Sequence, residues 1–188
     1  MIETLALAII FCKIKGYKIK PLFNTWHVYP IILMELAVWF IQINVFLESH
    51  WVLQYAPITK ALYISSYIFL VFKYELYITA IIGSAFVALG GVMNDIAIKA
   101  NNGYMPVFPS LSYLTGYASP EDFGKFDNLH ILGDSSTNLF FLTDIFDLGY
   151  CILSLGDVFI RIFVFIIVFS SIKKENSIHK ATKENFEC

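Results

Sequence analysis

The sequence predicts an all-α membrane protein with about five transmembrane helices and a structured outer loop that carries a short interfacial helix. Apolar residues make up 57% of the 188 positions and charged residues only 15%. Soluble domains are near half apolar and about a quarter charged. A soluble core of this length could not bury so much apolar surface, because surface-to-volume scaling limits burial. Lipid removes that limit, so the apolar stretches are expected to lie in a membrane.

Four apolar stretches approach the length of a membrane crossing, at residues 29–47, 58–73, 77–97 and 151–172. A crossing takes about 20 mainly apolar residues for a hydrocarbon layer of about 30 Å. A fifth apolar stretch, residues 1–12, is too short to cross a membrane by itself. Its helix is therefore expected to continue to about Lys20, with lysine stems reaching the interface. Residues 1–172 then form a single membrane domain, which a polar tail follows at 173–188.

The lysines predict the orientation, because positive charge prefers the cytoplasmic side of a membrane. With the N-terminus outside, the cytoplasmic side holds Lys13, Lys15, Lys18, Lys20, Lys73, Lys173, Lys174, Lys180 and Lys183. Lys60, Lys99 and Lys125 then lie outside, and Arg161 lies within the membrane. The inverted topology would put the larger group outside. We therefore expect a multi-pass protein of the cytoplasmic membrane with a cytoplasmic C-terminus.

Residues 99–150, called the cap below, are expected to fold onto the outer membrane surface. The cap is rich in aromatic residues, namely Tyr104, Phe108, Tyr113, Tyr117, Phe123, Phe126, Phe140, Phe141 and Phe146. Disordered segments lack such content, and ordered loops of this length are usually functional. Residues 138–148 are expected to form an amphipathic helix at the interface, with Asp134 or Ser135 as its N-cap.

Charged residues within the expected spans are the first candidates for function, because charge is costly in a membrane. Asp157 and Arg161 are four residues apart and share a helix face. An ion pair between them is the structural interpretation, and a catalytic role for Asp157 is the functional one. Glu35 and Gln42 share a face of another span, where Glu35 needs a partner such as Arg161 or a proton. Hydrogen bonding between helices and a proton or ion site are the two interpretations of Glu35.

A Gly-Gly pair at Gly90 and Gly91 is followed by Asn94 and Asp95 near the end of the expected third long span. Small residues allow close helix packing, so the sequence predicts a packing seam at Gly83, Ser84, Gly90 and Gly91. Asn94 and Asp95 are expected at the outer interface, either as helix-capping residues or as polar groups of a functional site.

Several chemistries are not indicated by this sequence. The histidines lack metal-ligand spacing, and phosphate-binding glycine loops and nucleophile-elbow motifs are missing, so neither a metal nor a cofactor is expected. The three cysteines, Cys12, Cys151 and Cys188, are too few and too far apart for a disulfide framework. No basic patch with interleaved aromatics argues for nucleic acid. The expected partners are the lipid bilayer and a membrane protein or lipid-like ligand.

Three motifs occur in order along the chain after the basic N-terminal hairpin. They are Asn-Asn-Gly-Tyr-Met-Pro-Val at 101–107, Leu-Thr-Asp-Ile at 142–145 and Leu-Ser-Leu-Gly-Asp-Val at 153–158. Over roughly residues 1–172 this arrangement resembles an uncharacterised family of bacterial polytopic membrane proteins, domain of unknown function 5317. The chain departs from the family pattern at Gly103, where a second glycine is expected beside it, and after Arg161, where a glycine is expected. The resemblance implies a bacterial cytoplasmic membrane protein and no particular activity.

A second resemblance is to the lipoprotein signal peptidases, which are four-span aspartyl enzymes. Here Gly90 and Gly91 precede a Gly-Tyr-Met-Pro-Val-Phe run at 103–108, and Asp157 opens the last span, where one catalytic aspartate of that family stands. Val107 takes the place of the other aspartate, and Ile98-Lys99 replaces the family's Asp-Arg pair. Aspartyl hydrolysis needs two carboxylates that share a water. A substitute carboxylate would have to come from Asp95, Asp134 or Asp144.

The leading expectation is a non-catalytic membrane protein, either an accessory subunit or a binder of a partner protein, lipid or amphiphile through the aromatic cap. The first alternative is a membrane hydrolase or peptidase of lipid or lipopeptide substrates that uses Asp157. The second is a small carrier or channel in which Glu35, Asp157 and Arg161 face one cavity.

Overall fold

The computed structural model describes residues 1–120, 123 and 129–186. Lys125, Phe126 and Cys188, which entered the sequence predictions, lie outside the described residues. The α-helices are α1 (Ile2–Ile14), α2 (Lys20–Phe23), α3 (Tyr29–Phe46), α4 (Ala56–Ser66), α5 (Ile68–Tyr74), α6 (Tyr77–Ala100), α7 (Leu111–Thr115) and α8 (Leu155–Phe186). Short 3-10 helices are η1 (Trp26–Val28), η2 (His50–Tyr55) and η3 (Phe140–Leu142). The strands are β1 (Met105–Val107), β2 (His130–Leu132), β3 (Asp144–Asp147) and β4 (Ile152–Ser154).

Within the described residues, four helical stretches are long and apolar enough to cross a membrane. They are Trp26–Phe46, Trp51–Tyr74, Tyr77–Ala100 and Leu155–Ala181. All four overlap the spans that the sequence predicts, and a small sheet lies in the cap between the last two. The prediction of an all-α membrane fold is therefore confirmed.

The first helix is shorter than the sequence predicted. Helix α1 ends at Ile14 and does not continue to Lys20, because Gly16 adopts a left-handed conformation with φ of 77°. The Gly16 N–H donates to the Lys13 carbonyl at 2.9 Å, and the Tyr17 N–H donates to the Cys12 carbonyl at 3.0 Å, which is a Schellman C-cap. The 13 residues of α1 extend for roughly 20 Å at the usual helical rise, which is less than a hydrocarbon layer.

The chain forms two compact units, each described by itself. Unit 1 comprises residues 1–36, 60–85 and 161–188, and unit 2 comprises residues 37–59 and 86–160. The long helices α3, α4, α6 and α8 each contribute one part to each unit.

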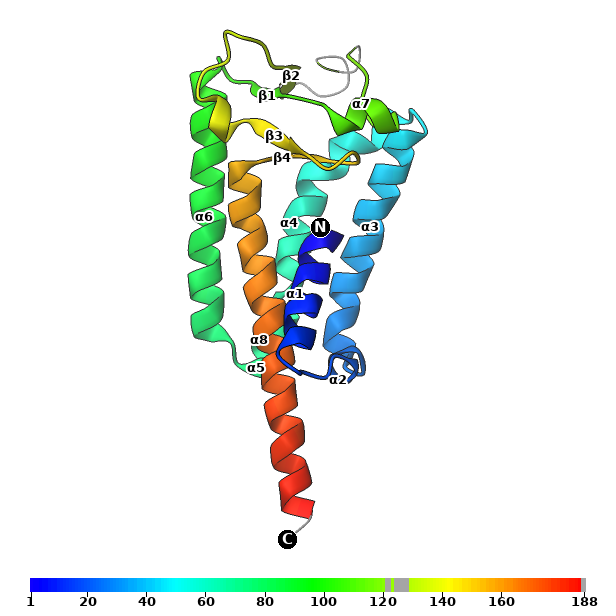
Figure 1. The fold of residues 1–188 in the computed structure, drawn as a ribbon, viewed down its shortest axis with the longest axis vertical. Helices are drawn as coiled ribbons and strands as arrows, with labels where there is room; N and C mark the ends of the chain where they lie inside the picture. Colours follow the sequence, from blue (N-terminus) through cyan, green and yellow to red (C-terminus); the bar gives the residue numbers. More distant parts are fainter. Residues whose placement is uncertain (121–122, 124–128, 187–188) are drawn as a thin grey trace. The chain divides into compact units, whose positions relative to one another are not determined.

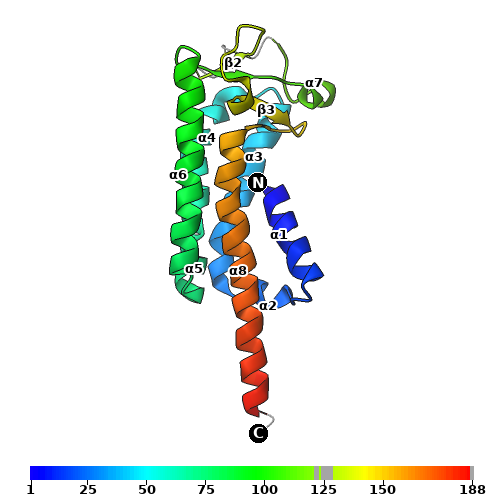
Figure 2. The same cartoon turned by 60° about the vertical axis from the view of Figure 1, so that its left-hand side comes forward.

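In unit 1, α1 lies along α8 and runs in the same direction (Figures 1 and 2). The Phe11 ring packs edge-on against Phe165 with centroids 5.8 Å apart. One turn past α1, the Lys18 N–H donates to Asn176 Oδ1 at 2.8 Å, and Asn176 Nδ2 donates to the Lys18 carbonyl at 2.8 Å. Helix α6 also approaches α8, because a Cβ at Gly83 would overlap the neighbouring aromatic ring of α8.

Unit 2 contains a four-stranded sheet in the order β2-β1-β3-β4. Strand β1 is parallel to both β2 and β3, and β3 pairs with β4 as an antiparallel hairpin. The central strand tolerates Pro106, although proline has no N–H for the ladder. The pairing with β3 starts only at Val107, opposite Asp144, and the Phe108 N–H makes the next bond to the Asp144 carbonyl at 2.9 Å.

The expected helix over residues 138–148 is wrong. The chain there forms η3 and then β3, because β3 finds a hydrogen-bonding strand on each side. Asp134 does not cap a helix; its Oδ1 accepts the Ser136 N–H at 2.8 Å and closes a local turn. The cap does carry a short helix, but this is α7.

In unit 2, α6 lies beside the start of α8, which follows directly on β4 (Figure 2). A Cβ at Gly90 would overlap the Gly156 carbonyl, and a Cβ at Gly156 would overlap both the Gly90 carbonyl and the Asn94 amide. Of the glycines predicted to form a packing seam, Gly83 and Gly90 lie against α8, each within its own unit, whereas nothing lies within 4 Å of a Cβ at Gly91. The backbones of the two helices therefore touch, which side chains larger than hydrogen would prevent.

We predict opposite effects for two adjacent substitutions in α6. Gly90→Ala should destabilise the fold by about 1–3 kcal/mol, because the new methyl group has no space. Gly91→Ala is the matched control and should stabilise by about 0.5–1 kcal/mol, because alanine has the higher helix propensity and meets nothing. Thermal unfolding in detergent measures both. Equal changes in the two variants would contradict the close crossing.

Candidate functional site

Asp157, the predicted catalytic candidate, lies in the first turn of α8. Ser154 precedes this helix, and its Oγ accepts the Asp157 N–H at 2.9 Å. The same hydroxyl donates to Asn94 Oδ1 of α6 at 2.7 Å. Ser154 is thus the N-cap, and Asp157 stands three residues later, which is the spacing of a capping box. A carboxylate at this position also complements the positive end of the helix dipole.

A second acidic group, Asp144, is buried in the sheet. Its side chain is 7% exposed, and its Oδ2 lies 3.5 Å from Nε2 of His130. His130 belongs to β2 and Asp144 to β3, so the pair bridges the central strand β1. The sequence offered Asp144 as a substitute carboxylate but did not indicate its histidine neighbour. The two residues meet only because strands far apart in the sequence pair with β1, so no local pattern could have predicted that His130 lies beside Asp144.

Asp147 connects the β3–β4 hairpin to α7. Its carboxylate accepts the Ser110 N–H at 2.6 Å, the Ser112 N–H at 2.8 Å, the Ser112 hydroxyl at 2.6 Å and the Gly149 N–H at 2.8 Å. Burial raises the pKa of this carboxyl, but the hydrogen bonds from Ser112, Ser110 and Gly149 outweigh burial and leave the pKa below its ordinary value. Beside it, burial raises the pKa of Tyr117 to about 12, with smaller contributions from Cys151 and Asp147.

The Asn101 side chain holds the turn that follows β2. Asn101 Nδ2 donates to the Asn138 carbonyl at 2.9 Å, and the Asn138 N–H donates back to Asn101 Oδ1 at 2.8 Å. Asn101 Nδ2 also donates to the Ala97 carbonyl in the last turn of α6 at 2.8 Å. Asn101 is 8% exposed, so these bonds are shielded from water.

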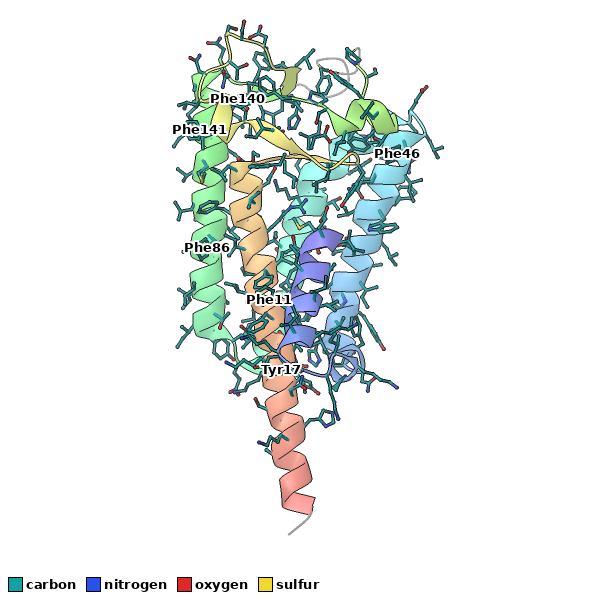
Figure 3. The ribbon with its side chains drawn as sticks, viewed as in Figure 1. Phe11, Tyr17, Phe46, Phe86, Phe140 and Phe141 are labelled. Carbon is teal, nitrogen blue, oxygen red and sulfur yellow. The ribbon has the colours of Figure 1, made fainter. Side chains whose placement is uncertain are left out.

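The turn after Asn138, residues 139–141, exposes apolar side chains, and we call it the apolar tip. Leu139 adopts a left-handed conformation with φ of 51°, which leucine rarely takes. The Phe140 and Phe141 side chains are 51% and 58% exposed and project beside the end of α6 (Figure 3). The Phe140 ring rests against Phe108 with centroids 4.7 Å apart. The apolar tip is thus held firmly at its base and open at its surface.

Unit 1 contains a cluster of polar side chains among apolar helices. Arg161 Nη1 donates to Glu3 Oε2 of α1 at 2.7 Å. Glu35 is 9% exposed, and its Oε1 lies 3.6 Å from the Met1 nitrogen. The Tyr67 hydroxyl donates to the Tyr63 hydroxyl at 2.9 Å, and the latter faces Glu35.

The six polar residues predicted within the spans are divided between the two units. Glu35 and Arg161 belong to unit 1, and Gln42, Asn94, Asp95 and Asp157 belong to unit 2. Gln42 Nε2 donates to the Tyr150 carbonyl at 3.5 Å, and Asp95 is exposed on α6. Arg161 has a partner, Glu3, that the sequence analysis did not name. The pair of Asp157 and Arg161 stays a prediction.

In the part of the chain that the structure describes, no group of three His, Cys, Asp or Glu side chains could hold a metal ion. The comparisons with known proteins identify a family. A family model described as "Family of unknown function (DUF5317)" matches residues 19–169. No curated protein and no solved structure matches the chain significantly.

We predict that Arg161→Leu costs about 3 kcal/mol of stability, because it leaves the Glu3 carboxylate without its guanidinium partner in a poorly solvated place. The double variant Glu3→Gln with Arg161→Gln removes both charges and should cost clearly less. Denaturant unfolding in detergent compares the two. If the double variant lost as much stability as Arg161→Leu, or more, the unpaired Glu3 charge would not be the reason for the loss of stability.

Proposed function

The chain belongs to the family of unknown function DUF5317, and from its own structure we propose that it is a non-catalytic membrane protein that binds a partner membrane protein through the apolar tip. The observation that carries this proposal is a pair of adjacent phenylalanines, Phe140 and Phe141, each more than half exposed on a firmly held turn. Aromatic side chains are enriched at the centres of protein interfaces, where they contribute most of the binding energy.

The rigidity of the apolar tip supports a protein partner over simple contact with lipid. Asn101 and Asn138 fix the base of the tip, and Leu142 packs under it against Ala97 and Met105. A preorganised surface loses less conformational entropy on binding, which matters for a specific partner. Fluid lipid requires no such fixed geometry.

The position of the apolar tip supports a partner that lies in the membrane. Phe140 and Phe141 project beside the end of α6 (Figure 3). In unit 2 this helix also exposes Leu89, Val92 and Ile96, which are 50%, 54% and 45% exposed. A partner that contacts both the tip and the exposed residues of α6 needs an apolar segment at membrane depth.

We place the protein in the bacterial cytoplasmic membrane with the N-terminus outside and the C-terminus in the cytoplasm. The support is the excess of lysines on the proposed cytoplasmic side. In this orientation the cap and its apolar tip face the outside. The partner would then meet the chain at the outer interface.

The rival functions are a hydrolase that uses Asp157 and a small carrier built on Glu35, Asp157 and Arg161. Asp157 stands in the first turn of α8, where a carboxylate complements the helix dipole, so its position there has an explanation that does not require catalysis. Glu35 and Arg161 lie in the same polar cluster of unit 1. A carrier would also need such a cluster, so this arrangement is compatible with the carrier function. Neither rival accounts for the exposed phenylalanines.

The test is a native purification from the original membrane, with the bound proteins weighed and identified. The wild type should carry one partner in fixed stoichiometry. The double variant Phe140→Ala with Phe141→Ala should weaken that association at least about tenfold, because exposed aromatic anchors contribute most to such interfaces. The matched control replaces Ile78 and Ile81, which are 75% and 70% exposed on another part of α6, with alanine and should keep the partner.

Two outcomes would overturn the proposal. One is a partner that the tip variant retains as well as the wild type does. The other is a wild-type chain that purifies alone and turns over a lipid or lipopeptide substrate. A melting temperature close to that of the wild type shows that the tip variant is folded.

A further inference from the structure

Exposed lysines lie on elements that meet at one end of unit 1, where α1 ends and α2 and α5 lie (Figure 1). We call this set the basic collar; it consists of Lys15, Lys18, Lys20, Lys73, Lys173 and Lys174, all of them exposed. These residues come from three separate parts of the chain: the segment from α1 to α2, the end of α5 and the middle of α8. Partner binding by the cap does not use any of them.

A pair of hydrogen bonds and an aromatic contact hold the three parts together. The Lys18 backbone exchanges two hydrogen bonds with the Asn176 side chain, which fixes the α1–α2 segment to α8. Trp26, which follows α2, packs edge-on against Phe69 of α5. The lysines of the basic collar are therefore brought together by the fold, although they are far apart in sequence.

The charge of the basic collar is strongly positive. The segments that carry it contain two carboxylates, Glu75 and Glu175. Glu175 is half-buried, so its carboxylate is less available to the exposed lysines than a carboxylate in water would be. Six ammonium groups against these two carboxylates leave an excess of positive charge that attracts anions.

Large apolar side chains are interleaved with the lysines. Ile14 is 72% exposed next to Lys15, and Phe72 is 61% exposed next to Lys73. Trp26 is 57% exposed and packs edge-on against Phe69 of α5, with centroids 5.8 Å apart. A free phosphate or other soluble anion needs only the lysines, whereas a molecule with an anionic head and acyl chains matches both surfaces.

We propose that the basic collar binds anionic phospholipid, with the lysine ammonium groups on the phosphate head and the apolar side chains along the acyl chains. Lysines at a membrane surface attract anionic lipid over a distance of about one Debye length. Because several chain segments contribute, a bound lipid would also link α1, α5 and α8.

The experiment measures lipid retention by the full chain, purified in neutral detergent and incubated with phosphatidylglycerol or phosphatidylcholine of the same acyl chains. Native mass spectrometry counts the bound lipid. Phosphatidylglycerol should stay bound and phosphatidylcholine should not. Replacing Lys15, Lys18, Lys20 and Lys73 with glutamine should weaken retention by roughly fivefold for each lysine removed.

Two further variants separate charge from folding. A variant with arginine at the same four positions should retain the lipid, because the positive charge is preserved. Lys60→Gln with Lys99→Gln removes lysines outside the collar and should also keep it. Equal retention of phosphatidylcholine, undiminished retention by the glutamine variant, or displacement of the lipid by inorganic phosphate at equal concentration would each overturn the proposal.

Discussion

The backbone contact between α6 and α8 at Gly90 and Gly156 is the constraint on which unit 2 depends. It brings Asn94 within hydrogen-bonding distance of Ser154, and Ser154 in turn begins α8 and ends β4. The start of the last helix and the edge of the sheet are therefore set by one crossing. A side chain at either glycine would separate the helices and move the N-cap away from its amide partner.

The cap depends on a few shielded polar groups more than on a large apolar core. Its strands have only three or four residues each, so the strand pairing alone contributes little. Asn101 holds the turn after β2, and Asp147 holds the start of α7 to the β3–β4 hairpin through three hydrogen bonds, with a fourth from Gly149 inside the hairpin. Such networks fix one geometry, because each unsatisfied partner in a poorly solvated place would cost free energy. That fixed geometry is what makes the apolar tip a plausible binding surface.

The sequence predicted the parts of this structure that depend on local pattern. The apolar lengths located the long spans, and Gly83 and Gly90, two of the small residues predicted to pack, lie where α6 meets α8. The packing of Gly156 was not predicted. The partner Glu3 of Arg161 is 158 residues away, and no local spacing could have indicated it. The prediction of a helix at residues 138–148 was wrong because it used only the local helical periodicity. The pairing of β3 with β1 and β4, which decides the structure there, is not visible in that local pattern. Phe140 and Phe141 of that segment lie on the short 3-10 helix η3 and not on an α-helix, and their place at a membrane surface stays a prediction.

The central claim is that the cap is ordered and holds its apolar tip in one position, and hydrogen exchange in lipid nanodiscs tests it most directly. The amides of Ser112, bonded to Asp147, and of Asn138, bonded to Asn101, should exchange far more slowly than amides of an unstructured peptide. The amide of Ser135, for which the structure shows no such bond among the described residues, serves as the internal reference and should exchange fast. Exchange at Ser112 and Asn138 as fast as at Ser135 would contradict the account, because a cap without fixed geometry could not present a preorganised tip.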